Sequence, residues 1–416
     1  MTLRICIDAR IESGRVGGVE QVACGIASGL ASLQDGDEQY YYLAYEGCDD
    51  WIAPMFGGRA KPLYEPGRPR DLSFRERIGA AIPPMRLAFH AARRWLWRYR
   101  VPSTMGTIER AGIDVVHFPF QPAFLTNVPS IYHPWDLQYM HLPELFTAYE
   151  RASRREMHTR LCRQARLVAV ANSWTKNDIA ANLAVPADRI AVVPVAPLLA
   201  GEGKASQVEQ DRVRTLYELP GDFIFYPAVT WPHKNHLGLI EALAILRRAQ
   251  GVTIPAVFTG RDWPHKAKVI RRAAELGVGG QIRFLGHVPR NDVTALYALS
   301  KAVVFPTRFE GGGLPLLEAM LAGRPVACSN VTALPAVAGD AALVFNPDDP
   351  QAIAGAVWRL WSDDDLRARL VAAGTERVAQ FTWETAARLF RAHYRRLGGR
   401  GLTDVDRALL TEPPIV

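Results

Sequence analysis

The most informative part of this 416-residue chain reads FPTRFEGGGLPLLEAMLAGRPV, residues 305–326. An apolar strand end is followed by three glycines, Gly311, Gly312 and Gly313, and Pro315 stands where a helix would begin. Glycines let backbone N–H groups approach an anion closely, and a helix N-terminus carries about half a positive charge. The pattern therefore predicts a phosphate-binding loop made by the main chain.

Two glutamates flank this loop. Glu310 precedes the glycines, and Glu318 lies one turn inside the predicted helix. Carboxylates so placed suit hydroxyl groups on both sides of a diphosphate, with a sugar near Glu310 and a ribose near Glu318. Taken alone, the pair also has an ordinary structural explanation, as a loop carboxylate and a helix-dipole partner.

Short apolar runs alternate with helical patterns along the chain, which is typical of parallel α/β sheets. In the first half, strands are predicted over 3–8, 114–118, 130–133, 167–171 and 190–193. In the second half they are predicted over 223–229, 256–259, 282–285, 302–305, 325–328 and 342–345. The two series predict two doubly wound, Rossmann-like domains facing a cleft, with ligands beyond the carboxyl ends of the strands.

A polar stretch between the two series is interpreted as a linker region. We expect an N-terminal domain over 1–200, a linker over 201–222, a C-terminal domain over 223–381, a helix over 382–398 and a tail over 399–416. The chain reads GGRG from residue 398, so the tail is predicted to pack loosely.

In its full setting, the glutamate pair resembles the Glu-x7-Glu signature of retaining glycosyltransferases of family 4, which have the GT-B fold. Other blocks similar to those of the family follow in the family's order, between residues 3 and 397. They are GGVE at 17–20, DVVHF at 114–118, NSWTKNDI at 172–179, WPHKN at 231–235, FLGHV at 284–288, ALP at 333–335 and FTWE at 381–384. In the family, the last block starts the helix that crosses back to the first domain. The resemblance also implies that the N-terminal domain is the acceptor side and that the C-terminal domain binds the nucleotide sugar.

The resemblance implies transfer of a sugar from a nucleoside diphosphate to an acceptor hydroxyl with retention of anomeric configuration. It implies catalytic roles for Glu310 on the donor sugar, Lys234 on the diphosphate, and a histidine that best matches His133. The implied donor-binding residues are Gly17, Gly18, Thr230, His287, Val288, Gly311, Gly312, Gly313, Leu314 and Glu318. No cofactor or metal is implied, since Asp-x-Asp strings at 35–37, 363–365 and 404–406 are interpreted as solvated charge.

Three positions depart from the family pattern. Val229 stands where many relatives carry an arginine that binds the diphosphate, which leaves Arg308 or backbone N–H groups as candidate replacements. Ala336 stands where relatives often have a glutamate, so a secondary contact is expected to be missing. Around His133 an inserted Pro-Trp dipeptide disturbs the alignment, and a structural and a functional histidine both remain open.

The donor and acceptor are specified less closely by the resemblance. The WPHKNH block at 231–236 looks most like that of mannosyltransferases of bacterial surface-polysaccharide assembly. GDP-mannose is therefore the expected donor, with UDP- and TDP-sugars as alternatives, and a glycan or polyprenyl-linked oligosaccharide is the expected acceptor. Alternative functions are a GT-B-fold NDP-sugar epimerase, a phosphorylase or a non-catalytic nucleotide-sugar-binding protein.

Composition narrows the class of protein. Hydrophobic residues make up 49% and charged residues 22%, which is typical of a globular chain. Apolar runs fall short of the roughly 18 residues of a membrane span. The chain lacks zinc-finger spacing and an RRM-like block, so no nucleic-acid partner is expected. Five scattered cysteines without a Cys-x-x-Cys pair favour the cytoplasm as the compartment.

The formal net charge of +7 is concentrated in one segment. Residues 68–100 contain nine arginines and two acidic residues, so the rest of the chain sums to zero. Aromatic and aliphatic residues are interleaved with the arginines, as in interfacial amphipathic segments. Two interpretations stay open: the segment binds the anionic inner face of the cell membrane, or its apolar residues pack inside the first domain.

Overall fold

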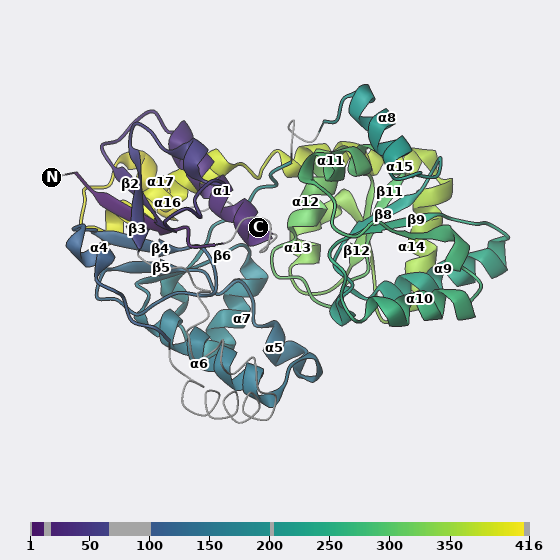
Figure 1. The fold of residues 1–416 in the computed structure, drawn as a ribbon, viewed down its shortest axis with the longest axis horizontal. Helices are drawn as coiled ribbons and strands as arrows, with labels where there is room; N and C mark the ends of the chain where they lie inside the picture. Colours follow the sequence, from purple (N-terminus) through teal and green to yellow (C-terminus); the bar gives the residue numbers. More distant parts are fainter. Residues whose placement is uncertain (1, 12–17, 66–100, 200–203, 412–416) are drawn as a thin grey trace. The chain divides into compact units, whose positions relative to one another are not determined.

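The computed structural model describes residues 2–11, 18–65, 101–199 and 204–411, which form two compact units (Figure 1). The first unit comprises Met1–Ala171, Lys176–Val193 and Trp383–Ile415, and the second comprises Asn172–Thr175 and Pro194–Thr382. The basic segment 68–100 lies outside the described residues, as does Gly17.

The first unit is built on a seven-stranded parallel sheet with the order β3-β2-β1-β4-β5-β6-β7. Its strands are β1 (Arg4–Asp8), β2 (Gln39–Tyr45), β3 (Ala60–Glu65), β4 (Val115–Phe118), β5 (Ser130–Tyr132), β6 (Leu167–Val170) and β7 (Ile190–Val192). Every residue of β4, β5 and β6 is buried, as expected for parallel strands covered on both faces. All five strands predicted for this half are confirmed, whereas β2 and β3 were not predicted.

A helix from the C-terminal part of the chain completes the first unit. The helices of this unit are α1 (Gly18–Ser32), α4 (Thr107–Arg110), α5 (Gln138–His141), α6 (Ala148–Gln164), α7 (Ser173–Leu183), α16 (Trp383–Leu397) and α17 (Asp404–Thr411). Helix α16 packs against α1, where a Cβ on Gly25 would lie 2.0 Å from Cε2 of Trp383. The expected return of the chain to the first domain is therefore confirmed, and a glycine on α1 makes room for it.

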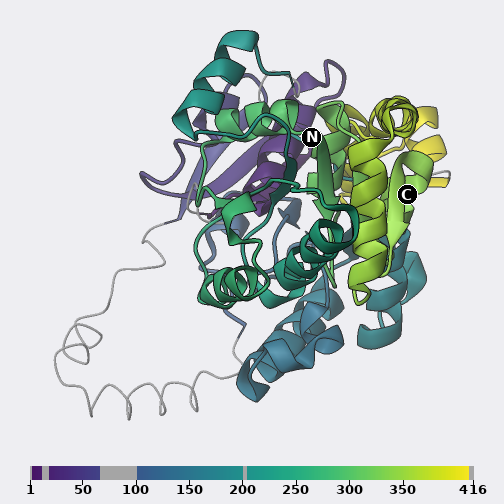
Figure 2. The ribbon, with the colours of Figure 1, turned by 90° about the vertical axis from the view of Figure 1, so that its right-hand side faces the viewer.

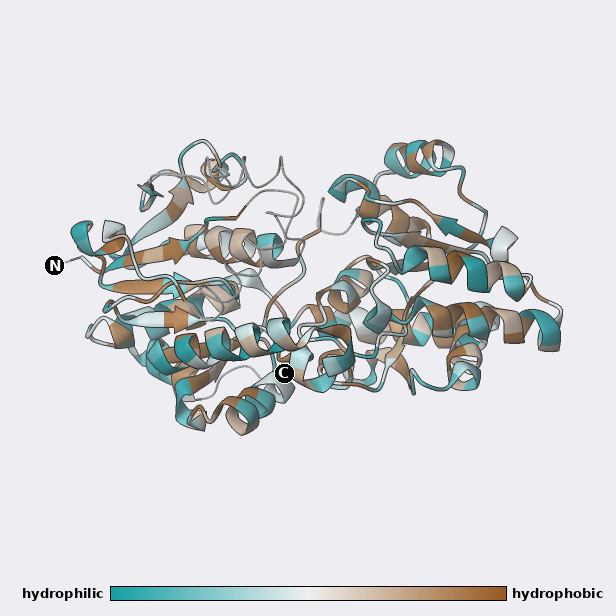
Figure 3. Ribbon diagram, turned by 60° about the horizontal axis from the view of Figure 1, so that its bottom comes forward, coloured by the Kyte–Doolittle hydropathy of each residue, from teal (hydrophilic) through white to brown (hydrophobic). Residues whose placement is uncertain are grey.

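The second unit contains a six-stranded parallel sheet with the order β10-β9-β8-β11-β12-β13. Its strands are β8 (Ile224–Pro227), β9 (Ala256–Thr259), β10 (Ile282–Phe284), β11 (Ala302–Phe305), β12 (Val326–Ser329) and β13 (Ala342–Phe345). All six predicted strands of this half are confirmed. Figure 3 shows brown, apolar strand ribbons most clearly in the first unit.

Helices cover both faces of the second sheet. They are α8 (Gln207–Leu216), α9 (His236–Gln250), α10 (Lys266–Glu275), α11 (Arg290–Leu299), α12 (Leu314–Leu321), α13 (Leu334–Ala338), α14 (Pro350–Ser362) and α15 (Asp364–Val378). Helices α10 and α14 both pack against α9, as Figure 2 shows, while α8 packs on α11 and α15 on α12. Among the described residues, no helix is long and apolar enough to span a bilayer.

The expected linker region over 201–222 contains a helix, because α8 occupies its middle. Ser206 and Glu209 form a capping box that starts the helix. Arg212 and Tyr217 then bond the carboxylate of Asp292 on α11, the tyrosine hydroxyl at 2.8 Å. These contacts fasten the helix to the second unit.

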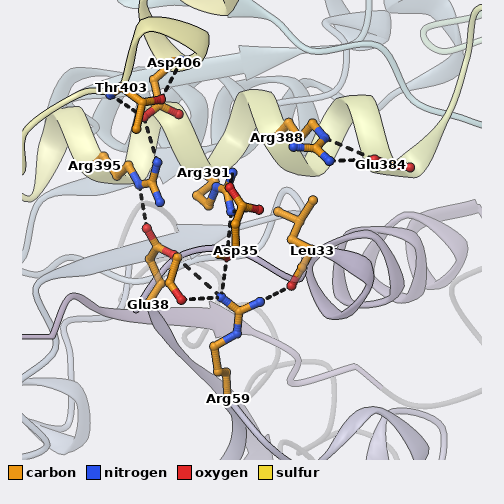
Figure 4. Close-up of polar contacts among 11 residues, drawn as sticks. Leu33, Asp35, Glu38, Arg59, Glu384, Arg388, Arg391, Arg395, Thr403 and Asp406 are labelled. Carbon is orange, nitrogen blue, oxygen red and sulfur yellow. Dashed lines mark hydrogen bonds and ion pairs between the residues drawn. The ribbon is translucent and has the colours of Figure 1, made fainter.

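The expectation of a loosely packed tail fails, because α17 is tied to α16 by a buried ion pair (Figure 4). Arg395 donates to Asp406 at 2.8 Å and to Glu38 at 2.6 Å, and both carboxylates are buried. Arg391 donates to both carboxylate oxygens of Asp35 at 2.9 Å. Asp35 and Asp406 are thus paired with arginines, which corrects the interpretation of their Asp-x-Asp strings as solvated charge.

Candidate active site

The candidate site lies at the carboxyl ends of two neighbouring strands, β8 and β11. After β8 the chain forms a short 3-10 turn, Pro232–Lys234, before α9 begins. After β11 it forms the glycine-rich loop that leads into α12. Neighbouring parallel strands end at the same edge of a sheet, so these two loops lie next to each other.

Backbone contacts hold the two loops together. The hydroxyl of Thr307 and the backbone N–H of Arg308 both donate to the carbonyl oxygen of His233, at 3.1 and 2.7 Å. The hydroxyl of Tyr226 donates to the carbonyl oxygen of Lys234 at 2.9 Å. These bonds fix the backbone on both sides of the site, so the side chain of Lys234 leaves from a rigid turn.

Lys234 and Glu310, two of the three predicted catalytic residues, form an ion pair. Nζ of Lys234 lies 2.8 Å from Oε2 of Glu310, and each side chain is only 18% exposed. The two residues are 76 positions apart in the sequence. The structure therefore brings together a cation suited to a diphosphate and a carboxylate suited to sugar hydroxyls.

The pKa of the Glu310 carboxyl lies below its usual value. Burial alone would raise this pKa, but the charge and hydrogen bond of Lys234, followed by the N–H of Gly313, lower it by more. Glu310 is therefore ionised at neutral pH and accepts hydrogen bonds without donating any. This state fits a residue that holds hydroxyl groups and does not fit a general acid.

The glycine loop opens α12 as the sequence predicts. Gly313 adopts a left-handed backbone conformation, with φ of 70°, at the helix N-cap, and Pro315 follows in the first turn. The N–H of Gly313 points toward Oε1 of Glu310 at 3.4 Å. The carbonyl oxygen of Gly311 accepts a hydrogen bond from Nδ2 of Asn172 at 2.8 Å, within the second unit. The loop is thus held at both ends beside the ion pair.

Glu318, the predicted ribose ligand, is buried on α12 with 6% of its surface exposed. Its Oε2 accepts a hydrogen bond from the hydroxyl of Tyr297 on α11 at 3.0 Å. Burial, and then the charge of Glu318, raise the pKa of Tyr297 well above its usual value, so the hydroxyl remains a donor. Sequence reasoning did not find Tyr297, because a tyrosine on a buried helix face carries no motif.

A small pocket opens at this site. Lys234 and Glu310 supply its charged groups, and most of the remaining wall is apolar or backbone. Its lining consists of Tyr226, Pro227, Ala228, Lys234, Phe305, Thr307, Glu310, Gly313, Pro315, Leu316 and Leu334. A few polar groups converging in an apolar pocket are typical of small-molecule sites.

The remaining predicted donor contacts of the second unit lie at its loops. Thr230 is buried, and its hydroxyl has no hydrogen-bond partner among the described residues. His287 is exposed, whereas Val288 is 6% exposed. Arg308, a candidate replacement for the arginine absent at Val229, donates to Asp348 at 2.7 Å. That guanidinium is therefore engaged outside the Lys234–Glu310 pair.

The predicted residues of the first unit follow β1 and β5. Gly18 starts α1 and is exposed. His133 follows β5 and is 2% exposed, with its Nε2 2.8 Å from Nε2 of His117. The other ring nitrogen of His117 lies 2.6 Å from the hydroxyl of Tyr394 on α16. Burial lowers the pKa of His133 to about 3, so its ring is neutral at physiological pH.

No group of three or more His, Cys, Asp or Glu residues in the described part of the chain is placed to hold a metal ion.

Comparisons with known proteins agree with this geometry. Residues 208–377 match the family model of the glycosyl transferases group 1. The O-antigen chain mannosyltransferase B of Escherichia coli is 36% identical over 223 residues, which cover 53% of this chain and 58% of the relative. The matched part thus spans little more than half of each protein.

Solved structures share the fold over nearly the whole chain. Anabaena Alr3699/HepE, crystallised in complex with UDP and glucose, is similar with a TM-score of 0.69 and 16% identity, covering 95% of this chain and all of that one. WaaG, a glycosyltransferase involved in lipopolysaccharide biosynthesis, is similar with a TM-score of 0.62 and 17% identity over the same shares. The chain therefore has the GT-B fold of glycosyltransferases, and its second unit contains the stretch that matches the glycosyl transferases group 1 model.

Proposed function

We propose that this chain is a retaining glycosyltransferase of family 4 that transfers mannose from GDP-mannose to a glycan or polyprenyl-linked oligosaccharide in surface-polysaccharide biosynthesis. The observation that carries the proposal is the Lys234–Glu310 pair beside the glycine loop, inside the matched domain. The 36% identity to an O-antigen mannosyltransferase supports mannose as the sugar.

In the proposed reaction, the bond between sugar C1 and the diphosphate oxygen breaks, and negative charge develops on the leaving diphosphate. The ammonium of Lys234 has three N–H groups and donates one to Glu310, so two remain for phosphate oxygens. The backbone N–H groups of the glycine loop and the N-terminus of α12 add positive potential where that charge develops. Together these groups supply the stabilisation that expulsion of the diphosphate needs.

Glu310 holds the donor sugar in this mechanism. Its carboxylate is ionised and oriented by Lys234, so it accepts hydrogen bonds from sugar hydroxyls and fixes C1 relative to the phosphates. The acceptor hydroxyl attacks C1 from the face that the diphosphate leaves, and its proton passes to a phosphate oxygen. The new C1–O bond then has the configuration of the broken one.

In this mechanism, protein groups balance the charge of the leaving diphosphate, and the reaction uses no cofactor or metal. The enzyme acts in the cytoplasm, docked on the inner face of the cell membrane through residues 68–100. It binds no nucleic acid.

The test compares Lys234→Ala, Glu310→Ala and, as a matched control, Lys301→Ala. Lys301 precedes β11 at the opposite end of the strand and pairs with Asp222 at 2.8 Å. We expect both site variants to lose about 100-fold or more in release of GDP from GDP-mannose, the scale of a lost charge-stabilising donor. The control should keep wild-type turnover.

Wild-type turnover in both site variants would overturn the assigned roles. The donor base is tested separately by thermal shift, where GDP should raise the melting temperature more than UDP at equal concentration. A larger rise in melting temperature with UDP than with GDP would indicate a UDP-sugar as the donor instead of GDP-mannose.

A further inference from the structure

Thr332, in the loop between β12 and α13, has an unusual backbone conformation. Its φ is 52°, in the left-handed region that favours glycine. Among the non-glycine residues with positive φ in the described part of the chain, Thr332 is the one with a branched Cβ. This conformation is costly because it brings Cβ close to the following carbonyl oxygen. Strain of this kind persists where the surrounding structure requires it, and it is concentrated at functional sites.

The side chain of Thr332 binds both polar groups of the Glu310 backbone. Its Oγ1 accepts a hydrogen bond from the N–H of Glu310 at 3.0 Å and donates one to the carbonyl oxygen of the same residue at 2.7 Å. A hydroxyl group can form both bonds because it is a donor and an acceptor at once. Glycine at position 332 would relieve the strain but could not hold Glu310 in this way.

The order of the strands explains why the two residues meet. β12 pairs with β11, with Cys328 opposite Phe305, so the loops that follow these strands leave the same edge of the sheet. The hydroxyl of Ser329 fastens the two strand ends by donating to the carbonyl oxygen of Phe305 at 3.0 Å. Beyond this point, the strained turn at Thr332 brings its hydroxyl to Glu310, which lies 22 positions earlier in the chain.

The contact fixes the base of the Glu310 side chain, as Lys234 fixes its tip. Nζ of Lys234 lies 2.8 Å from Oε2 of Glu310, and the turn that carries Lys234 is itself held by the hydroxyl of Tyr226. The carboxylate therefore has a defined position relative to the glycine loop. In a reaction that depends on orientation, a displacement of about 1 Å can cost a factor of about 100 in rate.

We propose that Thr332 is a positioning residue for Glu310, an inference that rests on the proposed function. Its hydroxyl holds the Glu310 backbone so that the carboxylate meets the hydroxyl groups of the donor sugar and orients C1 relative to the phosphates. In the proposed mechanism the nucleoside diphosphate binds other groups, namely Lys234, the glycine loop and Glu318. Thr332 therefore acts on the sugar half of the donor and not on the nucleotide half.

The test uses three substitutions that separate the hydroxyl from the backbone strain. Thr332→Ser keeps the hydroxyl, Thr332→Val keeps the branched shape without the hydroxyl, and Thr332→Gly removes both the hydroxyl and the strain. We expect kcat for release of GDP from GDP-mannose to fall about 10- to 100-fold in the valine and glycine variants. The serine variant should stay within about threefold of wild type, and GDP affinity should be unchanged in all three.

The melting temperature separates positioning from a merely structural role. The glycine variant should melt at a higher temperature than the valine variant, because glycine adopts the left-handed conformation without strain. Ala184→Gly is the matched control, since Ala184 is exposed directly after α7 and has the same φ of 52°. It relieves backbone strain at a position outside the second unit, so kcat should not change.

A kcat that follows the hydroxyl and not the melting temperature supports the inference. Wild-type kcat in Thr332→Gly would overturn it, as would a kcat that rises and falls with the melting temperature across the three variants. Hydrogen exchange at the Glu310 amide tests the contact without any donor, and it should be faster in the valine and glycine variants than in wild type and Thr332→Ser. Equal exchange in all four proteins would also overturn the inference. Turnover of GDP-mannose by the wild type reports on the proposed function independently.

Discussion

At the scale of single residues, the predicted ribose ligand Glu318 is held by the hydroxyl group of Tyr297, a residue that belongs to no sequence motif. Tyr297 donates to Oε2 of Glu318 at 3.0 Å in a buried setting. We expect Tyr297→Phe to lower the free energy of unfolding by about 1–3 kcal/mol, because a buried carboxylate loses a donor. GDP affinity should fall by about tenfold, since Glu318 is then less well oriented.

Isothermal titration with GDP and urea denaturation check this prediction. Tyr217→Phe is the matched control, because its hydroxyl donates at 2.8 Å to Asp292, which lies on the same helix as Tyr297, and not to Glu318. The control should lose stability and keep its affinity for GDP. Equal GDP affinity in Tyr297→Phe and wild type would contradict the proposed role of Tyr297.

The sequence identified the charged members of the site but not how they are held. Lys234 and Glu310 stand after strands that the sequence predicts, so their meeting at one sheet edge could be expected. The bonds of Thr307 and Arg308 to the carbonyl oxygen of His233 depend on backbone orientation, which residue type does not reveal. Predicted roles for His133 and the donor-binding residues stay predictions, although the partner of His133, His117, is now identified.

At the scale of elements, the strands that the sequence analysis missed differ from those it found. β2 reads QYYYLAY, an aromatic run with high strand propensity but without the β-branched residues used to find the others. β3 lies at the sheet edge and contains Pro62, which an edge strand tolerates because one side needs no ladder donor. The sequence signal for helix α8 is the Ser206–Glu209 capping box, which lies in a polar stretch that we interpreted as a linker.

The junction of α16 and α17 carries a prediction at this scale (Figure 4). Arg395, 9% exposed, bonds the buried carboxylates of Glu38 and Asp406. Arg395→Met would remove the nearest cation from both buried carboxylates, with Arg59 still 3.9 Å from Glu38, so we expect the free energy of unfolding to fall by about 3–5 kcal/mol. Arg388→Met on the same helix breaks only an exposed pair with Glu384 and should cost about 0.5 kcal/mol or less.

Urea denaturation as a function of pH gives this prediction a second readout. Burial raises the pKa of Asp406, but the hydrogen bonds of Arg395 and Thr403 outweigh it, so the pKa lies below its usual value. A lowered pKa stabilises the fold above the unfolded-state pKa, and this contribution is lost as pH falls through the folded-state value. The difference between wild type and Arg395→Met should therefore narrow in acid. A constant difference from neutral to acidic pH would contradict the assigned pairing.

At the scale of the whole molecule, the sequence specified the architecture more fully than the chemistry. Alternation of strands and helices predicted both Rossmann-like sheets, because buried parallel strands must be apolar throughout. The FTWE block at 381–384 predicted the return of the chain, and the structure adds its cause in the close fit of Trp383 on Gly25. Donor base, sugar and acceptor depend on loop contacts that a strand pattern does not encode, so they remain proposals.

The uneven charge of the chain leads to the last prediction. Residues 68–100 carry the whole formal net charge of +7, and each arginine near an anionic surface contributes about 1 kcal/mol to binding. Replacing Arg93 and Arg94 by glutamine should weaken sedimentation with phosphatidylglycerol vesicles about 30-fold, the equivalent of roughly 2 kcal/mol. Replacing Arg248 and Arg271, exposed in the second unit, removes the same charge and should leave vesicle binding nearly unchanged.

Equal losses of vesicle binding in both double variants would mean that net charge alone, and not the segment 68–100, attracts the protein to the vesicles. An absence of binding by the wild type would favour the alternative in which the segment packs within the first domain.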